Sequence, residues 1–133
     1  MTDAELVIGA LEQVAERRGD PADVIYARLF ERYSQYEDMF VMDKDGGVRA
    51  NMLKTCFTCI IGMAEGKDTP RLQIEASRLH HDGYGLSSED LDNIFIVIRD
   101  TVRDCLAGDW TIAQEAAWTK VLDELSAVSA SSV

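Results

Sequence analysis

The sequence has few residues that break helices, with 2 prolines and 9 glycines among 133 residues. It has no apolar run near the ~18 consecutive residues that a membrane-spanning helix needs. Basic residues are also scarce, because 13 lysines and arginines stand against 24 acidic residues, for a net charge of −11. That charge repels phosphate backbones and anionic lipids, so we expect no nucleic-acid partner and no membrane attachment. The acidic start, from Met1 to Glu5, lacks the basic and apolar regions of a secretory signal, which predicts a cytoplasmic protein.

Only three cysteines are present, Cys56, Cys59 and Cys105, and an odd number favours reduced thiols. Cys56 and Cys59 form a Cys-x-x-Cys pair, a spacing also found in zinc and redox sites. No second pair completes a set of four ligands, and the pair lies within an apolar helical run from Leu53 to Ile61. We therefore interpret the two cysteines as packing residues of a helix.

Apolar residues recur at helical spacing through almost the whole chain, and no repeat or linker divides it. Thr2-x-x-Glu5 and Thr111-x-x-Gln114 have the pattern of capping boxes, and Pro21 stands at a first helical turn. With no strand pattern, the sequence predicts one all-α domain, residues 1–133, of six to seven helices. The expected helices are 1–19, one that begins after Pro21, 48–63, one from Thr69 to Gly83, one from Ser87 or Ser88 to Gly108, and one from Thr111 to Leu125. Residues 126–133 are mostly small and polar and are expected to fray.

The segment Asp43-Lys44-Asp45-Gly46 resembles part of a calcium-binding EF-hand loop. That loop needs a glycine at its sixth position and a glutamate at its twelfth. With Asp43 first, Val48 and Lys54 occupy these positions; with Gly46 sixth, Met52 is twelfth. Neither register works, and so residues 43–47 are predicted to form a solvated turn.

The chain has 2 histidines, His80 and His81, at the end of the predicted helix that begins at Thr69. Successive helical residues point about 100° apart, so at most one histidine faces a given pocket, and the periodicity alone does not choose between them. A second interpretation is a pair of partly exposed histidines whose charge complements the helix dipole. The sequence contains no hydrolytic constellation and no phosphate-binding glycine loop, so chemistry in this chain would need a cofactor.

From about Asp20 to Leu125 the sequence resembles the bacterial globins, including the haem domains of flavohaemoglobins. The segment 25–30 is similar to the family's second-helix motif, and Phe40 follows it at the spacing of the family's haem-stacking phenylalanine. His81-Asp82-Gly83-Tyr84-Gly85-Leu86 matches the proximal-histidine motif in a register that selects His81 over His80. The usual proline of the short third helix is Ser34 here, and its hydrophobic neighbour is Tyr36.

The resemblance implies a globin-like fold that holds haem b, with His81 as the iron ligand. Phe40 would lie against the porphyrin, and Tyr26 on the opposite, distal side would donate a hydrogen bond to a bound gas. Arg49 falls within a residue of the usual distal glutamine or histidine, and would contact the gas or a haem propionate. The other pocket residues that the resemblance implies are Leu53, Phe57, Leu86 and Leu91. An ordinary structural role stays open for each: core packing for the apolar residues, a hydroxyl bonded elsewhere for Tyr26, and solvation for Arg49.

The implied function is reversible binding of oxygen, nitric oxide or carbon monoxide, for storage, sensing or partner-assisted NO and oxygen chemistry. The proximal tyrosine of flavohaemoglobins is Leu91 here, and the 133 residues contain no reductase domain. NO dioxygenase turnover would therefore need a separate reductase, and we do not expect an independent enzyme. The alternative is a haem-free globin-fold domain that senses an apolar ligand or binds a partner protein. Either interpretation allows a monomer or a homodimer.

Overall fold

The computed structural model describes residues 2–40, 43, 46–67 and 88–131, and all its secondary structure within these ranges is helical. This confirms the all-α prediction for the part of the chain that is described. The elements are α1 (Asp3–Arg18), α2 (Ala22–Arg32), the 3₁₀ helix η1 (Ser34–Phe40), α3 (Gly47–Ala64), α5 (Ser88–Leu106), the 3₁₀ helix η3 (Ala107–Asp109) and α6 (Ile112–Ser131). The predicted helix from Thr69 to Gly83 lies outside the described residues.

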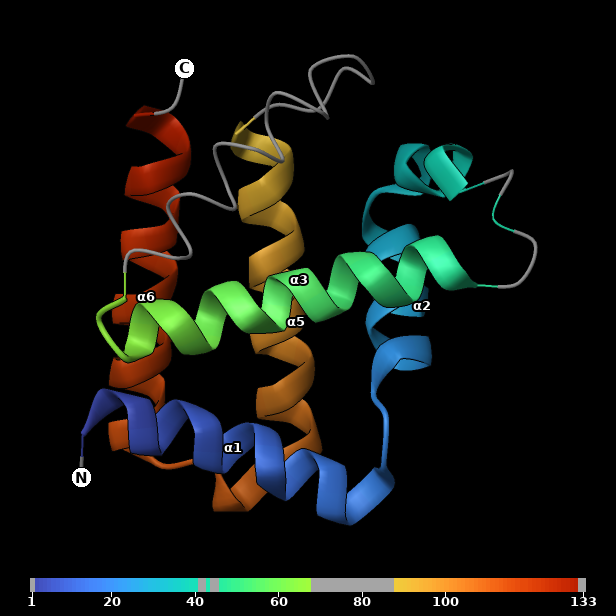
Figure 1. Ribbon diagram of the computed structural model, residues 1–133. Coiled ribbons are helices and arrows are strands. Elements are labelled where there is room, and N and C mark those ends of the chain that lie inside the picture. The colour runs from blue at the N-terminus through green and yellow to red at the C-terminus, as the bar shows by residue number, and fades with distance from the viewer. Residues whose placement is uncertain (1, 41–42, 44–45, 68–87, 132–133) are drawn as a thin grey trace.

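The helices form two crossing sets (Figure 1). Helices α5 and α6 run antiparallel side by side, and α2 packs against α5 on the other flank. Helix α3 crosses this set at about its middle, and α1 crosses it at the end that holds the start of α6. No helix among the described residues has both the length and the apolar character needed to cross a membrane.

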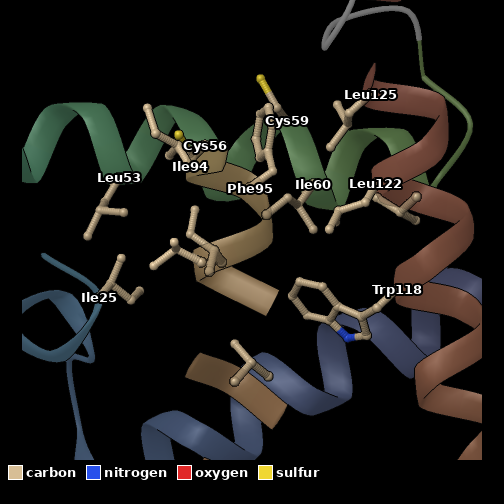
Figure 2. Close-up of a cluster of buried hydrophobic side chains, with 14 of the residues drawn as sticks. Ile25, Leu53, Cys56, Cys59, Ile60, Ile94, Phe95, Trp118, Leu122 and Leu125 are labelled. Atoms are coloured by element: carbon tan, nitrogen blue, oxygen red, sulfur yellow. The ribbon is translucent and has the colours of Figure 1, made fainter. Parts of the chain in front are cut away.

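The core lies where the two sets cross, and Figure 2 shows its central part. Trp118 of α6 is fully buried there, together with Ile60 of α3 and Ile98 of α5. The apolar stripes read from the sequence supply this core: on α5 and α6 they include Ile94, Phe95, Val102, Val121, Leu122 and Leu125, all buried. Burial of these side chains is the main favourable term for folding.

The first residues of α6 and α1 follow the local sequence signals. The Thr111 side chain accepts a hydrogen bond from the Gln114 backbone N–H at 3.0 Å, and the Gln114 side chain accepts from the Thr111 N–H at 2.9 Å. This is the reciprocal capping box that the sequence predicted for α6. At the start of α1 the Thr2 hydroxyl accepts a hydrogen bond from the Glu5 backbone N–H at 3.1 Å. The Glu5 carboxylate accepts a hydrogen bond from the Thr2 hydroxyl, and not from the Thr2 backbone N–H as in a full capping box.

Two predicted helix ends differ from the structure. Helix α6 continues through Ser131 instead of fraying after Leu125, because Val128 is buried and the Ser126 hydroxyl donates to Asp92 of α5 at 3.0 Å. Helix α5 ends at Leu106, and the residue with the left-handed conformation is Ala107 (φ 48°), not Gly108. Contacts with α5 and the core thus set the end of α6, and the local sequence does not show them.

Candidate functional site

Three aromatic rings meet where α2, η1 and α3 come together. The Tyr26 and Phe40 rings contact edge to face, with centroids 5.5 Å apart and an interplanar angle of 74°. Phe30, one turn after Tyr26 on α2, completes the group at 5.6 Å from Tyr26 and 5.9 Å from Phe40. Tyr26 is buried, whereas Phe30 and Phe40 are partly buried. Tyr26 and Phe40, which the resemblance assigns to the gas ligand and to the porphyrin of one pocket, are therefore in direct contact.

The Tyr26 hydroxyl donates a hydrogen bond to the backbone carbonyl oxygen of Arg49 at 2.7 Å. This bond joins the inner face of α2 to the first turn of α3. Burial raises the pKa of the Tyr26 phenol well above its usual value, with further increases from Cys56 and Asp43 and an opposing decrease from Arg49. The phenol therefore stays protonated at physiological pH and acts as a hydrogen-bond donor.

The Arg49 guanidinium is paired with Asp43. Its Nε lies 3.1 Å from Asp43 Oδ2, and the same carboxylate accepts the backbone N–H groups of Arg49 at 3.0 Å and Val48 at 3.1 Å. The Asp43 carboxylate thus satisfies free N–H groups at the start of α3. It also holds the side chain of Arg49, one of the two predicted distal residues. Burial raises the pKa of Asp43, but these backbone and guanidinium donors together hold it below its usual range.

The prediction that residues 43–47 form a solvated turn is wrong for Asp43. Its side chain is only 3% exposed, because it turns inward to the helix start. Gly46 precedes α3 in the left-handed conformation, with φ at 79°, which lets the chain turn between Asp43 and the helix. The sequence signal for this role is an aspartate a few residues before the Gly-Gly pair at the start of α3.

The other predicted pocket residues that the structure describes lie on α3 and α5. Leu53, one turn after Arg49, is 3% exposed, and Figure 2 shows it facing Ile25 of α2. Phe57, one turn further, is partly buried against the core. Leu91 is buried near the start of α5. His81 and Leu86 lie outside the described residues.

Cys56 and Cys59 lie on the buried side of α3 and belong to the core (Figure 2). Burial raises the pKa of the Cys56 thiol to about 12 and that of Cys59 to about 11. Metal binding and thiol exchange both need the thiolate, which these pKa values disfavour. Among the described residues, no three His, Cys, Asp or Glu side chains gather as a metal site. The packing interpretation of the pair therefore accounts for both cysteines.

Tyr36 has a role that the sequence analysis missed. It is 4% exposed, donates a 2.5 Å hydrogen bond to Asp90 of α5, and accepts one from Asn93 at 3.3 Å. Burial, together with the Asp90 bond, raises the pKa of Tyr36 to about 12. Tyr36 thus joins η1 to α5 through two hydrogen bonds.

Comparison with known proteins adds no relative: no family model matches the chain, and no significant match is found among curated proteins or solved structures.

Proposed function

We propose that this chain is a globin-type haem protein that reversibly binds a diatomic gas, with haem b held through His81. The observation that carries the proposal is the meeting of Tyr26, Phe40 and Arg49, which come from three separate elements. The sequence motifs had selected these residues by spacing alone. A chance match of short motifs would not require them to lie together.

The described residues fit the distal side of such a pocket. They offer an aromatic ring at Phe40, apolar side chains at Leu53 and Phe57, and a protonated phenol at Tyr26. When bound, haem supplies the iron centre at which a gas is held. His81 would ligate the iron, Phe40 would cover part of the porphyrin, and Leu53, Phe57, Leu86 and Leu91 would exclude water from the pocket.

Two groups would determine how tightly a gas is held. The Tyr26 O–H would have to turn from the Arg49 carbonyl to donate to the gas, so its present 2.7 Å bond competes with that role. The Arg49 guanidinium would first have to leave Asp43. Both residues would therefore have to give up an existing contact to reach a gas. The need for a separate reductase favours gas storage, sensing or partner-assisted chemistry over fast turnover.

Haem titration of the purified apo-protein tests the proposal. We expect a Soret band that saturates at one haem per chain, and a ferrous form whose visible bands shift with carbon monoxide. Phe40→Ala should raise the rate of haem loss about tenfold, since Phe40 is expected to cover the porphyrin. Phe30→Ala is the matched control, because it opens the same ring cluster without removing a predicted haem contact, and it should change that rate less than threefold, on the order of 0.6 kcal/mol or less. A protein that stays colourless would refute the proposal.

One observation favours the alternative, a haem-free globin-fold domain that binds an apolar ligand or a partner protein. The hydroxyl of Tyr26 is already bonded and its ring packs on Phe30 and Phe40, so the cluster is complete as an ordinary core. This alternative predicts that haem fails to saturate at one per chain, and that Phe30→Ala and Phe40→Ala destabilise the apo-protein by similar amounts.

A further inference from the structure

Four arginines gather where α2 and α5 lie side by side (Figure 1). Arg28 and Arg32 are one turn apart on α2, and Arg99 and Arg103 are one turn apart on α5. The chain as a whole has a net charge of −11 and only 13 basic residues, so this concentration of guanidinium groups runs against its composition. We call these four residues the arginine cluster.

Asp100 stands at the centre of the arginine cluster and is 7% exposed. Its Oδ2 accepts from Arg32 at 2.9 Å, and its Oδ1 accepts from Arg99 Nε and Nη2 at 3.1 and 3.0 Å. Arg103 Nη2 lies 3.3 Å from the same Oδ1. One buried carboxylate thus contacts three guanidinium groups, two from α5 and one from α2.

Asp104 is the second carboxylate of this region and is more exposed. It lies 2.8 Å from Arg28 Nη1 and 3.9 Å from Arg103 Nε. These ion pairs therefore join four arginines to two aspartates, and a local excess of positive charge remains. Pairing α2 with α5 would need only matched charges, so the joining of the helices does not explain the excess.

The excess charge faces solvent. The side chains of Arg32 and Arg103 are 40% and 39% exposed, and they contact different oxygen atoms of Asp100. Each guanidinium has five N–H donors, and the contacts with Asp100 and Asp104 use only part of them. Donors on two helices, anchored from within by one carboxylate, are pre-organised to chelate an anion with several oxygen atoms.

We propose that the arginine cluster binds a phosphate-class oxyanion, either free phosphate or the phosphate group of a small metabolite. The planar guanidinium fork matches phosphate oxygens, and Arg32 of α2 and Arg103 of α5 would supply it from two helices. Arg28 and Arg99 add charge and hold the inner carboxylates. This site contains none of the residues proposed to hold haem, so its test is independent of the function proposed above.

Calorimetric titration of the full chain at pH 7 and constant ionic strength tests the site, with inorganic phosphate in one arm and methyl phosphate in the other. We expect saturable binding of one anion. Arg32→Gln combined with Arg103→Gln should weaken it at least about tenfold, because two positive charges leave the site. Arg18→Gln, an exposed arginine at the end of α1, is the matched control and should bind as the natural chain does.

A gain-of-affinity variant separates binding from a purely structural role. Asp104→Asn removes the exposed carboxylate and should tighten phosphate binding about threefold. If the arginine cluster is only a structural ion-pair network, Asp104→Asn should lower the stability of the protein and leave its affinity for phosphate unchanged. Tighter binding of methyl phosphate would indicate a metabolite, and binding of inorganic phosphate alone would indicate the free ion. No saturable heat in either arm, or equal heats from the double variant and the natural chain, would overturn the proposal.

Discussion

The Tyr26 hydroxyl donates a 2.7 Å hydrogen bond to the backbone carbonyl of Arg49. Tyr26 belongs to α2 and Arg49 to the first turn of α3, so the bond fixes the angle at which α3 leaves the α2–η1 segment. Asp43 strengthens the same junction, because it accepts two backbone N–H groups of that turn. The predicted distal residues are therefore also structural residues, and their two roles need separate measurements.

Removal of the Tyr26 hydroxyl measures its structural role. Tyr26→Phe should lower the free energy of unfolding of the apo-protein by about 1 kcal/mol, the net worth of one buried hydrogen bond. Urea unfolding followed by far-UV circular dichroism gives this value. Tyr33→Phe is the control, since the Tyr33 hydroxyl has no hydrogen-bond partner among the described residues, and its effect should stay within about 0.5 kcal/mol. Equal effects of both variants would show that the Arg49 bond does not stabilise the fold.

The junction also depends on the charge of Asp43. Asp43→Asn keeps the shape of the side chain, but its neutral amide holds Arg49 and the start of α3 less well. We expect a lower unfolding temperature by calorimetry. Asp38→Asn changes an exposed carboxyl of η1 and should leave that temperature nearly unchanged. A higher unfolding temperature for Asp43→Asn would contradict this, because it would mean that desolvation of the carboxylate destabilises the fold more than its hydrogen bonds stabilise it.

Asp100 should make stability depend on pH in the acid range. Burial raises its pKa, but Arg32, Arg99 and Arg103 outweigh burial and hold the pKa below its usual value. Its contribution is therefore present above pH ~4, the pKa of an unfolded aspartate, and is lost as the pH falls through the lower folded pKa. Asp100→Asn should cost about 2 kcal/mol at pH 7 and show a shallower loss of stability between pH ~4 and pH ~2. Urea unfolding at several pH values tests this, and parallel curves for the two proteins would contradict it.

Ala107 has a backbone conformation that is less favourable for alanine than for glycine. Its φ of 48° lies in the left-handed region, which costs an L-residue roughly 1 kcal/mol. Ala107→Gly should therefore stabilise the protein by about that amount in urea unfolding. The same exchange at exposed Ala116, inside α6, should destabilise it by about 1 kcal/mol because glycine weakens a helix interior. Destabilisation at both positions would mean that the Ala107 side chain makes a contact worth more than the backbone cost.

The sequence predicted the features that local chemistry determines. The spacing of apolar residues located the helices, and Thr111 with Gln114 marked the start of α6 correctly. The resemblance to globins selected Tyr26, Phe40 and Arg49, and these residues are in contact in the structure, whereas their roles in a haem pocket stay predictions. The roles of His81 and Leu86 stay predictions, since both residues lie outside the described part of the chain.

Features that depend on distant partners were not predicted. Asp43 looked like a solvated turn residue, because nothing local shows that its carboxylate turns inward to α3. Tyr36 looked like a mild departure from a motif, yet its partner Asp90 lies 54 positions along the chain. The continuation of α6 past Leu125 likewise rests on Asp92 of another helix. In each case a tertiary contact outweighs the local preference.

The most direct test of the central claim is the ferrous carbon-monoxide spectrum of two single-histidine variants reconstituted with haem. If His81 is the iron ligand, His81→Ala should lose the wild-type Soret and visible bands, whereas the neighbouring His80→Ala should keep them. Imidazole added to His81→Ala should restore bands close to those of the natural chain. A His81→Ala protein that keeps the wild-type spectrum, or a natural chain that takes up no haem, would contradict the account.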